Sequence, residues 1–150
     1  MLTNEVRILK RLNYKHIIKF YEVYEEDTNI CIITEYIDGT RLFDHIVKNG
    51  RLTESESAIF AKQLLLTLNY MESEGVIHRD IKPENILFTY DKTGKLVLKL
   101  IDFGLATYHF SRDTIKKCGT AGYTAPEILL GDSYDFKADL YSCGIVMYIW

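Results

Sequence analysis

The part of the sequence that most restricts the fold is a long amphipathic segment followed at once by a highly charged loop. Residues 53–75 place Thr53 and Glu56 in capping-box register, carry apolar residues at helical spacing and end at Gly75, so we expect a helix. The loop IHRDIKPEN, residues 77–85, then brings a histidine, two cations and two anions between apolar neighbours. This order predicts a secure helix that leads directly into a candidate site.

Prolines are rare in this chain, and both stand in unusual clusters. Pro83 lies in the charged loop, and Pro126 lies in a second cluster that reads TAPE. Because proline fixes φ and lacks an N–H, we expect both loops to have a specified conformation. Both loops are therefore candidate sites.

Apolar residues also recur on one helical face at the start of the chain. Leu2, Val6, Leu9 and Leu12 share that face, so we expect an amphipathic helix that begins at or before Met1. Charged residues interrupt this segment, which argues against a signal peptide, and no apolar run reaches transmembrane length.

Two hairpins are expected from runs of β-branched and aromatic residues. Residues 17–24 and 30–36 flank the polar turn EEDTN. Residues 86–90 and 95–101 flank the turn DKTG and form the second hairpin. Periodicity thus switches between helix and strand along the chain.

Composition excludes several classes of protein. With 47% hydrophobic and 26% charged residues among 150, the chain suits one globular domain. A net charge of −3 argues against a nucleic-acid partner or an anionic membrane surface. Cys31, Cys118 and Cys143 are far apart and without CxxC spacing, so neither a disulfide framework nor a zinc site is expected. A reducing compartment fits, the cytoplasm with the nucleus as the alternative.

The charged loop and a later turn together suggest one chemistry. Asp80 can accept or orient the proton of a hydroxyl, and Lys82 can hold an anion. Asn85 and Asp102, the latter beside Gly104, offer the oxygen ligands that suit Mg²⁺ shared with phosphates. A lone Asp on a loop is more often a cap or a solvated turn, so the combination carries the prediction. A base, a cation and metal ligands predict phosphoryl transfer.

Three motifs resemble those of eukaryotic protein kinases. HRDIKPEN at 78–85, DFG at 102–104 and APE at 125–127 are similar to the catalytic loop, the magnesium loop and the end of the activation segment. The resemblance implies an α+β, partial protein-kinase-like fold, with 1–36 as the end of the small lobe and hinge start and 37–150 as the hinge end and first part of the large lobe. It implies that the chain is truncated at both ends.

The same resemblance implies ATP and Mg²⁺ as cofactors and a role for each matching residue. Asp80 would be the catalytic base, Lys82 would steady the transferred phosphate, and Asn85 with Asp102 would bind magnesium. These four residues match the family motif directly.

Residues outside the loop receive nucleotide-binding roles by the same resemblance. Thr34 would be the gatekeeper, the backbone of Glu35 and Ile37 would bond adenine, and Leu87 would lie under the base. Leu9 and Phe20 would join two motif residues in a stacked spine. The structural or regulatory positions implied are Glu5, His78, Arg79, Phe103, Gly104, Thr120, Glu127 and Asp139.

Substrate class also follows from the resemblance. Lys82 and GTAGY at 119–123 are similar to serine/threonine kinases rather than tyrosine kinases, so a protein substrate with Ser or Thr is expected. The phrasing around the motifs is similar to the calcium/calmodulin-dependent group. A regulatory domain or partner would lie outside this chain.

The sequence departs from the family at two positions. Arg41 stands where relatives usually carry a glutamate, which argues against a preference for basic substrates, although Glu84 favours it. Lys116 replaces the usual phosphorylated threonine, and a lysine cannot pair with Arg79. Thr114 can serve instead or can be an unmodified loop residue.

Two classes of function stay open at this point. The first is a serine/threonine kinase that transfers the γ-phosphoryl group of ATP. The second is a catalytically inactive kinase-like module that binds a partner through its large-lobe surface. The intact catalytic residues favour the enzyme.

Overall fold

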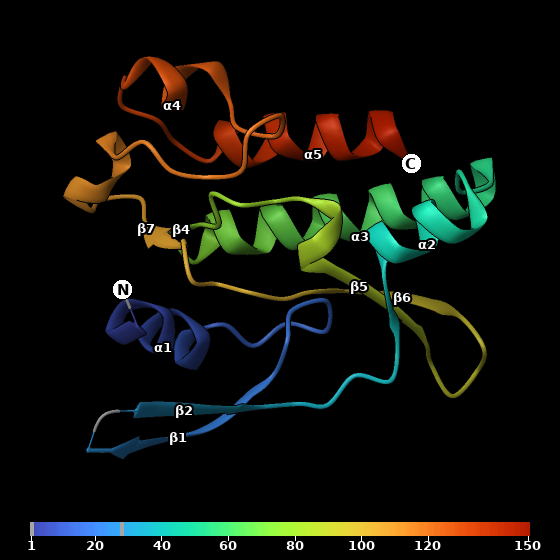
Figure 1. Ribbon diagram of the computed structural model, residues 1–150, viewed down its shortest axis with the longest axis horizontal. Helices are drawn as coiled ribbons and strands as arrows, with labels where there is room; N and C mark the ends of the chain where they lie inside the picture. The colour runs from blue at the N-terminus through green and yellow to red at the C-terminus, as the bar shows by residue number, and fades with distance from the viewer. Residues whose placement is uncertain (1, 28) are drawn as a thin grey trace.

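The computed structural model describes residues 2–27 and 29–150, and Figure 1 shows their arrangement. Helix α3 crosses the middle of the molecule, with α5 on one side and α1 and a two-stranded hairpin on the other. The helices are α1 (Leu2–Arg11), α2 (Leu42–Asn49), α3 (Glu54–Ser73), α4 (Pro126–Leu130) and α5 (Lys137–Ile149). The strands are β1 (Phe20–Glu26), β2 (Asn29–Thr34), β3 (Thr40–Arg41), β4 (Val76–Ile77), β5 (Ile86–Tyr90), β6 (Leu96–Leu100) and β7 (Thr107–Tyr108). This mixture of helices and small antiparallel sheets confirms the predicted α+β class.

Helix α1 buries the apolar face that its periodicity predicts. Leu9 and Leu12 are almost fully buried, and Ile8 is fully buried beside them. Val6 is half-buried. The predicted start at or before Met1, and the side chain of Leu2, lie outside the described residues.

Strands β1 and β2 form the first predicted hairpin, and they pair in antiparallel register from Phe20↔Thr34 onward. The first strand begins later than residue 17 because Ile17 makes a separate parallel bridge to Leu100. The second strand ends at Thr34, because the next residues leave the hairpin for the large part of the chain. Thr28, in the predicted turn, lies outside the described residues.

Helix α3 has the predicted capping box. The Thr53 side chain accepts a hydrogen bond from the Glu56 amide at 3.3 Å, and the Glu56 carboxylate accepts one from the Thr53 amide at 2.9 Å. At the other end, Gly75 takes a φ of 71°, which an L side chain rarely adopts. The buried face consists of Phe60, Leu64, Thr67, Leu68 and Met71.

Strands β5 and β6 form the second predicted hairpin and are fastened to α3 by one side chain. The Gln63 amide group donates to the Leu96 carbonyl at 2.8 Å and accepts from the Leu98 amide at 2.7 Å. The charged loop ends where β5 begins, and the DFG turn follows the end of β6. Because β5 and β6 are paired, this hairpin sets the relative position of the two predicted site loops.

Helix α2 and the two-residue strands were not expected from local sequence. Helix α2 has only 8 residues, and Leu42 is the one that is fully buried, so its apolar pattern is short. Strand β4 pairs with β7 about thirty residues away, and this contact rather than local propensity makes both segments extended.

The core has one large cluster around α1, α3 and the β5–β6 hairpin. A smaller cluster joins the start of the charged loop to α4 and α5 and is made by Ile77, Ala125, Ile128, Tyr134 and Ala138. None of the helices within 2–27 and 29–150 has the length and apolarity to cross a membrane.

We predict that Thr53→Ala lowers the free energy of unfolding by about 1 kcal/mol, because it removes the acceptor for the Glu56 amide. Urea denaturation followed by circular dichroism measures the change. Ser57→Ala, one turn further along α3, removes a hydroxyl outside the box and is the matched control. An equal loss in both variants would contradict the capping role.

The capping box should also make stability depend on pH. Hydrogen bonds from the Thr53 side chain and backbone lower the pKa of Glu56 below its usual value of 4.5. A lowered folded pKa stabilises the protein above the unfolded pKa, and this stabilisation is lost as the pH falls through the folded value. The stability difference between the parent and Thr53→Ala should therefore shrink as the pH falls below 4.5. A difference that stays constant down to pH 3 would count against this coupling.

Candidate active site

One buried carboxylate on α5 holds the charged loop in place. Asp139, in the first turn of α5, accepts hydrogen bonds from the amides of His78 at 2.7 Å and Arg79 at 2.8 Å. Arg79 has a φ of 69°, a left-handed conformation that costs a non-glycine residue about 1 to 3 kcal/mol. Burial raises the pKa of Asp139, while the nearby His78 and the two amides oppose the rise. This carboxylate therefore supports a strained turn that local interactions alone would not favour.

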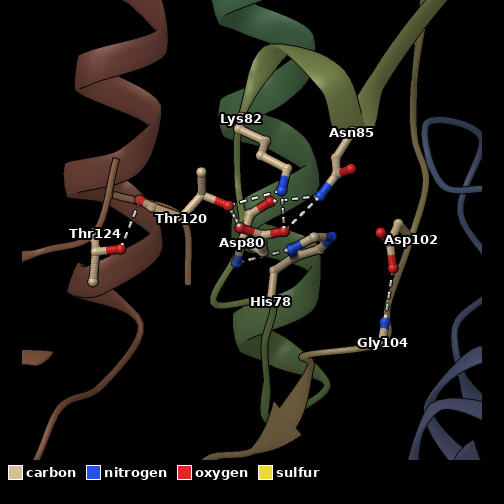
Figure 2. Close-up of polar contacts among 8 residues, drawn as sticks. All are labelled: His78, Asp80, Lys82, Asn85, Asp102, Gly104, Thr120 and Thr124. Atoms are coloured by element: carbon tan, nitrogen blue, oxygen red, sulfur yellow. Dashed lines mark hydrogen bonds and ion pairs between the residues drawn. The ribbon is translucent and has the colours of Figure 1, made fainter. Parts of the chain in front are cut away.

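Asp80 lies at the centre of a polar cluster, shown in Figure 2. Its carboxylate accepts from Lys82 Nζ at 2.8 Å, from Thr120 Oγ1 at 2.6 Å and from Asn85 Nδ2 at 3.0 Å. Lys82 Nζ also donates to Thr120 Oγ1 at 2.7 Å. The structure thus brings three of the predicted catalytic residues together with Thr120, which lies forty residues away from Asp80 in the sequence.

The surroundings of Asp80 favour its charged form. Burial by itself would raise the pKa of this carboxyl, but hydrogen bonds from Lys82 and Thr120 outweigh burial, and the pKa is lowered. An ionised carboxylate of low basicity is suited to orient a hydroxyl and to accept its proton late in a reaction.

Asn85 and Asp102 present oxygen atoms to the same side of the cluster. The Nδ2 group of Asn85 donates to two acceptors of Asp80, the backbone carbonyl at 2.9 Å and the carboxylate. In Figure 2 the amide oxygen of Asn85 points away from Asp80, toward the side on which Asp102 lies. Asp102 has a φ of 62° and accepts a hydrogen bond from the Gly104 amide at 3.1 Å. An exposed carboxylate and a neutral amide oxygen fit the ligand preferences of Mg²⁺.

Glu5 of α1 reaches the same turn. A Cβ atom placed on Gly104 would lie 3.2 Å from Asp102 Oδ1 and 3.8 Å from Glu5 Oε2, so the two carboxylates border one small space. Burial and then the charge of Asp102 raise the pKa of Glu5. A cation between them would relieve this repulsion.

His78 and Phe103 connect the charged loop to the core. Their rings meet edge to face with centroids 4.8 Å apart, and Phe103 is fully buried. Burial lowers the pKa of His78, so its ring is neutral, and its Nδ1 accepts from the Asp80 amide at 3.2 Å. Leu9 lies in the same core cluster, and Phe20 packs against that cluster.

The predicted nucleotide-binding residues lie at the junction between the hairpin and the larger part. Thr34 ends β2 and is half-buried, as are Ile37 and Leu87. The Glu35 side chain turns to Lys99, with Glu35 Oε1 2.5 Å from Lys99 Nζ. Its backbone amide bonds the Lys19 carbonyl at 2.8 Å.

Lys99 is a residue that the sequence analysis did not select. The signal was a cation in the middle of an otherwise apolar strand, KLVLKLI. Its Nζ also donates to the Ile17 carbonyl at 3.4 Å. Lys99 therefore connects Glu35 of the predicted hinge to the backbone at Ile17, and we call this pair of contacts the brace. The last predicted residue, Glu127, lies half-buried in the first turn of α4 and borders a cavity of about 370 Å³.

We predict that Asp139→Asn destabilises the protein by about 1 to 3 kcal/mol, because an amide nitrogen cannot accept from a loop N–H and leaves it unsatisfied in the interior. Thermal denaturation measures the loss. Asp135→Asn is the matched control, since this carboxylate accepts from the Lys137 amide at the exposed start of the same helix. If the Asp139 variant unfolds at the same temperature as the control, the anchoring role is refuted.

Comparison with known proteins gives one consistent family. The family model described as Protein kinase domain matches residues 1–150. A serine/threonine-protein kinase of Drosophila persimilis is 44% identical over 146 residues, which cover 97% of this chain and 19% of that protein. Calcium-dependent protein kinase 4 of Plasmodium falciparum is 40% identical over 149 residues, covering 99% of this chain and 28% of that protein.

A probable myosin light chain kinase of Dictyostelium discoideum is 43% identical over 145 residues, covering 96% of this chain and 30% of that protein. The chain therefore spans less than a third of the length of these relatives.

Proposed function

Because this chain belongs to the protein kinase domain family, we propose that it supplies the catalytic loop and metal-binding turn of a serine/threonine protein kinase. The observation that carries the proposal is the arrangement around Asp80, whose carboxylate is bonded to Lys82, Thr120 and Asn85. A positive charge on Lys82, a base at Asp80 and an oxygen ligand on Asn85 thus lie close together, and phosphoryl transfer needs all three kinds of group. These intact groups favour an enzyme over a binding module without activity.

Each residue has a separate task in the proposed reaction. Asp80 orients the substrate hydroxyl and receives its proton as the oxygen attacks. Lys82 places positive charge beside the incoming phosphoryl oxygens, and its bond to Thr120 limits where that charge can lie. Asn85 and Asp102 would hold Mg²⁺. Bound Mg·ATP would supply the γ-phosphoryl group, with ADP as the leaving group, and the metal would offset the charge of the phosphates.

The nucleotide would lie between the predicted hinge and β5. The Glu35 side chain is occupied by Lys99, so only the backbone of Glu35 and Ile37 faces the base in this proposal. Leu87 on β5 pairs with Arg41 of β3, and we propose that it forms the floor of the base site.

Substrate and context are also part of the proposal. The hydrogen bond between Lys82 and Thr120 supports a protein substrate with Ser or Thr, because the sequence pattern that pairs these residues resembles serine/threonine kinases. The greater length of the relatives supports a regulatory domain or partner beyond the 150 residues. The thiols of Cys31, Cys118 and Cys143 are free, which supports a reducing compartment, the cytoplasm or the nucleus.

We predict that Asp80→Asn and Asp102→Asn impair the enzyme in different ways. In the protein expressed from its complete coding sequence, Asp80→Asn should lower kcat by about 10² to 10⁴ and leave nucleotide affinity almost unchanged, because the base acts in the transition state. Asp102→Asn should weaken nucleotide binding in the presence of Mg²⁺, because it removes a metal ligand.

Single-turnover kinetics and isothermal titration calorimetry separate the two effects. Asp91→Asn, in the exposed turn between β5 and β6, is the matched control and should leave both kcat and affinity near those of the parent. Turnover of Asp80→Asn within threefold of the parent would disprove the role of Asp80. Unchanged Mg²⁺-dependent affinity in Asp102→Asn would disprove its role as a ligand.

We predict that a degenerate peptide array shows labelling of Ser and Thr rather than Tyr. Arg41 is exposed on β3, so Arg41→Glu should raise activity on peptides with arginine N-terminal to the target by removing a repulsive charge. Arg51→Glu, which makes the same charge change after α2, is the control. Tyrosine as the main product, or an equal response in both variants, would contradict the prediction.

A further inference from the structure

Tyr134 lies in the segment between α4 and α5. With its backbone and its side chain it contacts residues 105–124, between the DFG and APE motifs, which we call the activation segment. Tyr134 is 5% exposed and belongs to the smaller core cluster, together with residues of α4 and α5. The Tyr134 amide donates to the Thr114 carbonyl at 3.1 Å, and the Tyr134 hydroxyl donates to the Lys116 carbonyl at 3.0 Å. Arg79 Nη1 donates to the same hydroxyl at 2.9 Å.

Arg79 links this hydroxyl to the rest of the site. Its Nε donates to the Leu105 carbonyl at 2.6 Å, just after the DFG turn, and its backbone amide is bonded to Asp139. The side chain therefore joins the catalytic loop, the segment after the DFG turn and, through Tyr134, the backbone at Lys116. Every one of these contacts is made by protein atoms that the sequence encodes.

The position of Lys116 makes this contact relevant to the reaction. Lys116 lies four positions before Thr120 in the sequence. The hydroxyl of Thr120 is bonded to both Asp80 and Lys82. Thr120 is fixed further by its carbonyl, which accepts from Thr124 Oγ1 at 2.8 Å. A displacement of the backbone at Lys116 would thus be transmitted over a short distance to the groups around the Asp80 carboxylate.

The chemistry of the Tyr134 hydroxyl suits a permanent contact. Burial and a hydrogen bond with Cys118 raise its pKa, which Arg79 opposes, and the value is about 12. The hydroxyl therefore keeps its proton at physiological pH and can donate to Lys116 while it accepts from Arg79. Phenylalanine would fill the same space but could make neither bond.

We infer that Tyr134 is a positioning residue that fastens the activation segment to Arg79 through its hydroxyl and keeps Thr120 in place beside Asp80 without an added phosphate. The inference rests on the proposed kinase function for its effect on the reaction. The fastening itself is a property of the fold and can be measured without any activity. The contact meets the segment at Lys116 and is made by the Tyr134 hydroxyl and the Lys116 carbonyl.

Native-state proteolysis tests the fastening directly. Lys116 and Lys117 are exposed, so trypsin cleavage after them reports how often this segment opens. In the protein expressed from its complete coding sequence, Tyr134→Phe should accelerate this cleavage about three- to tenfold, as the loss of one or two net hydrogen bonds implies. Tyr141→Phe, on the exposed side of α5, is the matched control and should cleave like the parent. Mass spectrometry assigns the cleavage sites.

A double-mutant cycle separates the fastening from a general loss of stability. Tyr134→Phe, Arg79→Lys and the double variant are compared by cleavage rate at Lys116 and Lys117 and by Tm. If Arg79 acts through the hydroxyl, the double variant should cleave about as fast as the faster single variant. If the double variant is cleaved faster by the product of the two single effects, the inference is overturned. It is also overturned if cleavage at every trypsin site accelerates in proportion to the loss of Tm.

Steady-state kinetics then tests the consequence for the reaction. Tyr134→Phe should lower kcat/KM for a peptide substrate by about the same three- to tenfold factor and leave KM for ATP unchanged, because the activation segment meets the site through Thr120. Phosphatase treatment of the parent should leave both cleavage and kcat/KM unchanged. Cleavage that rises to the Tyr134→Phe level after phosphatase treatment would overturn the inference. If Tyr134→Phe is cleaved faster than the parent but the parent itself has no kinase activity, the contact made by Tyr134 is supported and the proposed function is refuted.

Discussion

Two amides of the catalytic loop point at one buried carboxylate, and the active-site geometry depends on that contact. Asp139 accepts from the amides of His78 and Arg79, and so supports a left-handed turn at a residue that is not glycine. Because Asp139 lies in the first turn of α5 while the loop follows α3, the contact joins the loop to a second helix. The position of Asp80 therefore depends on a residue about sixty positions later in the chain.

The site combines a fixed half and an open half. The Asp80 carboxylate accepts hydrogen bonds from Lys82, Asn85 and Thr120. Those from Lys82 and Thr120 outweigh the effect of burial on its pKa, so the carboxylate is ionised before any substrate arrives. Around Asp102 the carboxylates of that residue and Glu5 border one space, and burial together with the charge of Asp102 raises the pKa of Glu5. Such a division suits an enzyme that organises its base in advance and leaves the charge balance of the metal side to the bound nucleotide.

Local sequence predicted the elements whose patterns are strong and short in range. The capping box of α3 and the two hairpins follow from side chains a few residues apart, and the structure has them. Helix α2 and the pairing of β4 with β7 depend on distant contacts and were missed. The polar motifs indicated the site residues, yet the roles of Lys99 and Tyr134 depend on partners that only the fold brings near.

The brace behind the hinge has a consequence for how this region can evolve. Glu35 is bonded to Lys99 through its side chain, so the identity of that side chain is set by the brace and not by a ligand. A reversal or loss of charge at one of the two positions would leave the other ion half-buried without a counter-charge. The two positions should therefore change together among related chains. The backbone groups of Glu35 and Ile37, which we propose as the contacts to the nucleotide, would be the same after every such exchange.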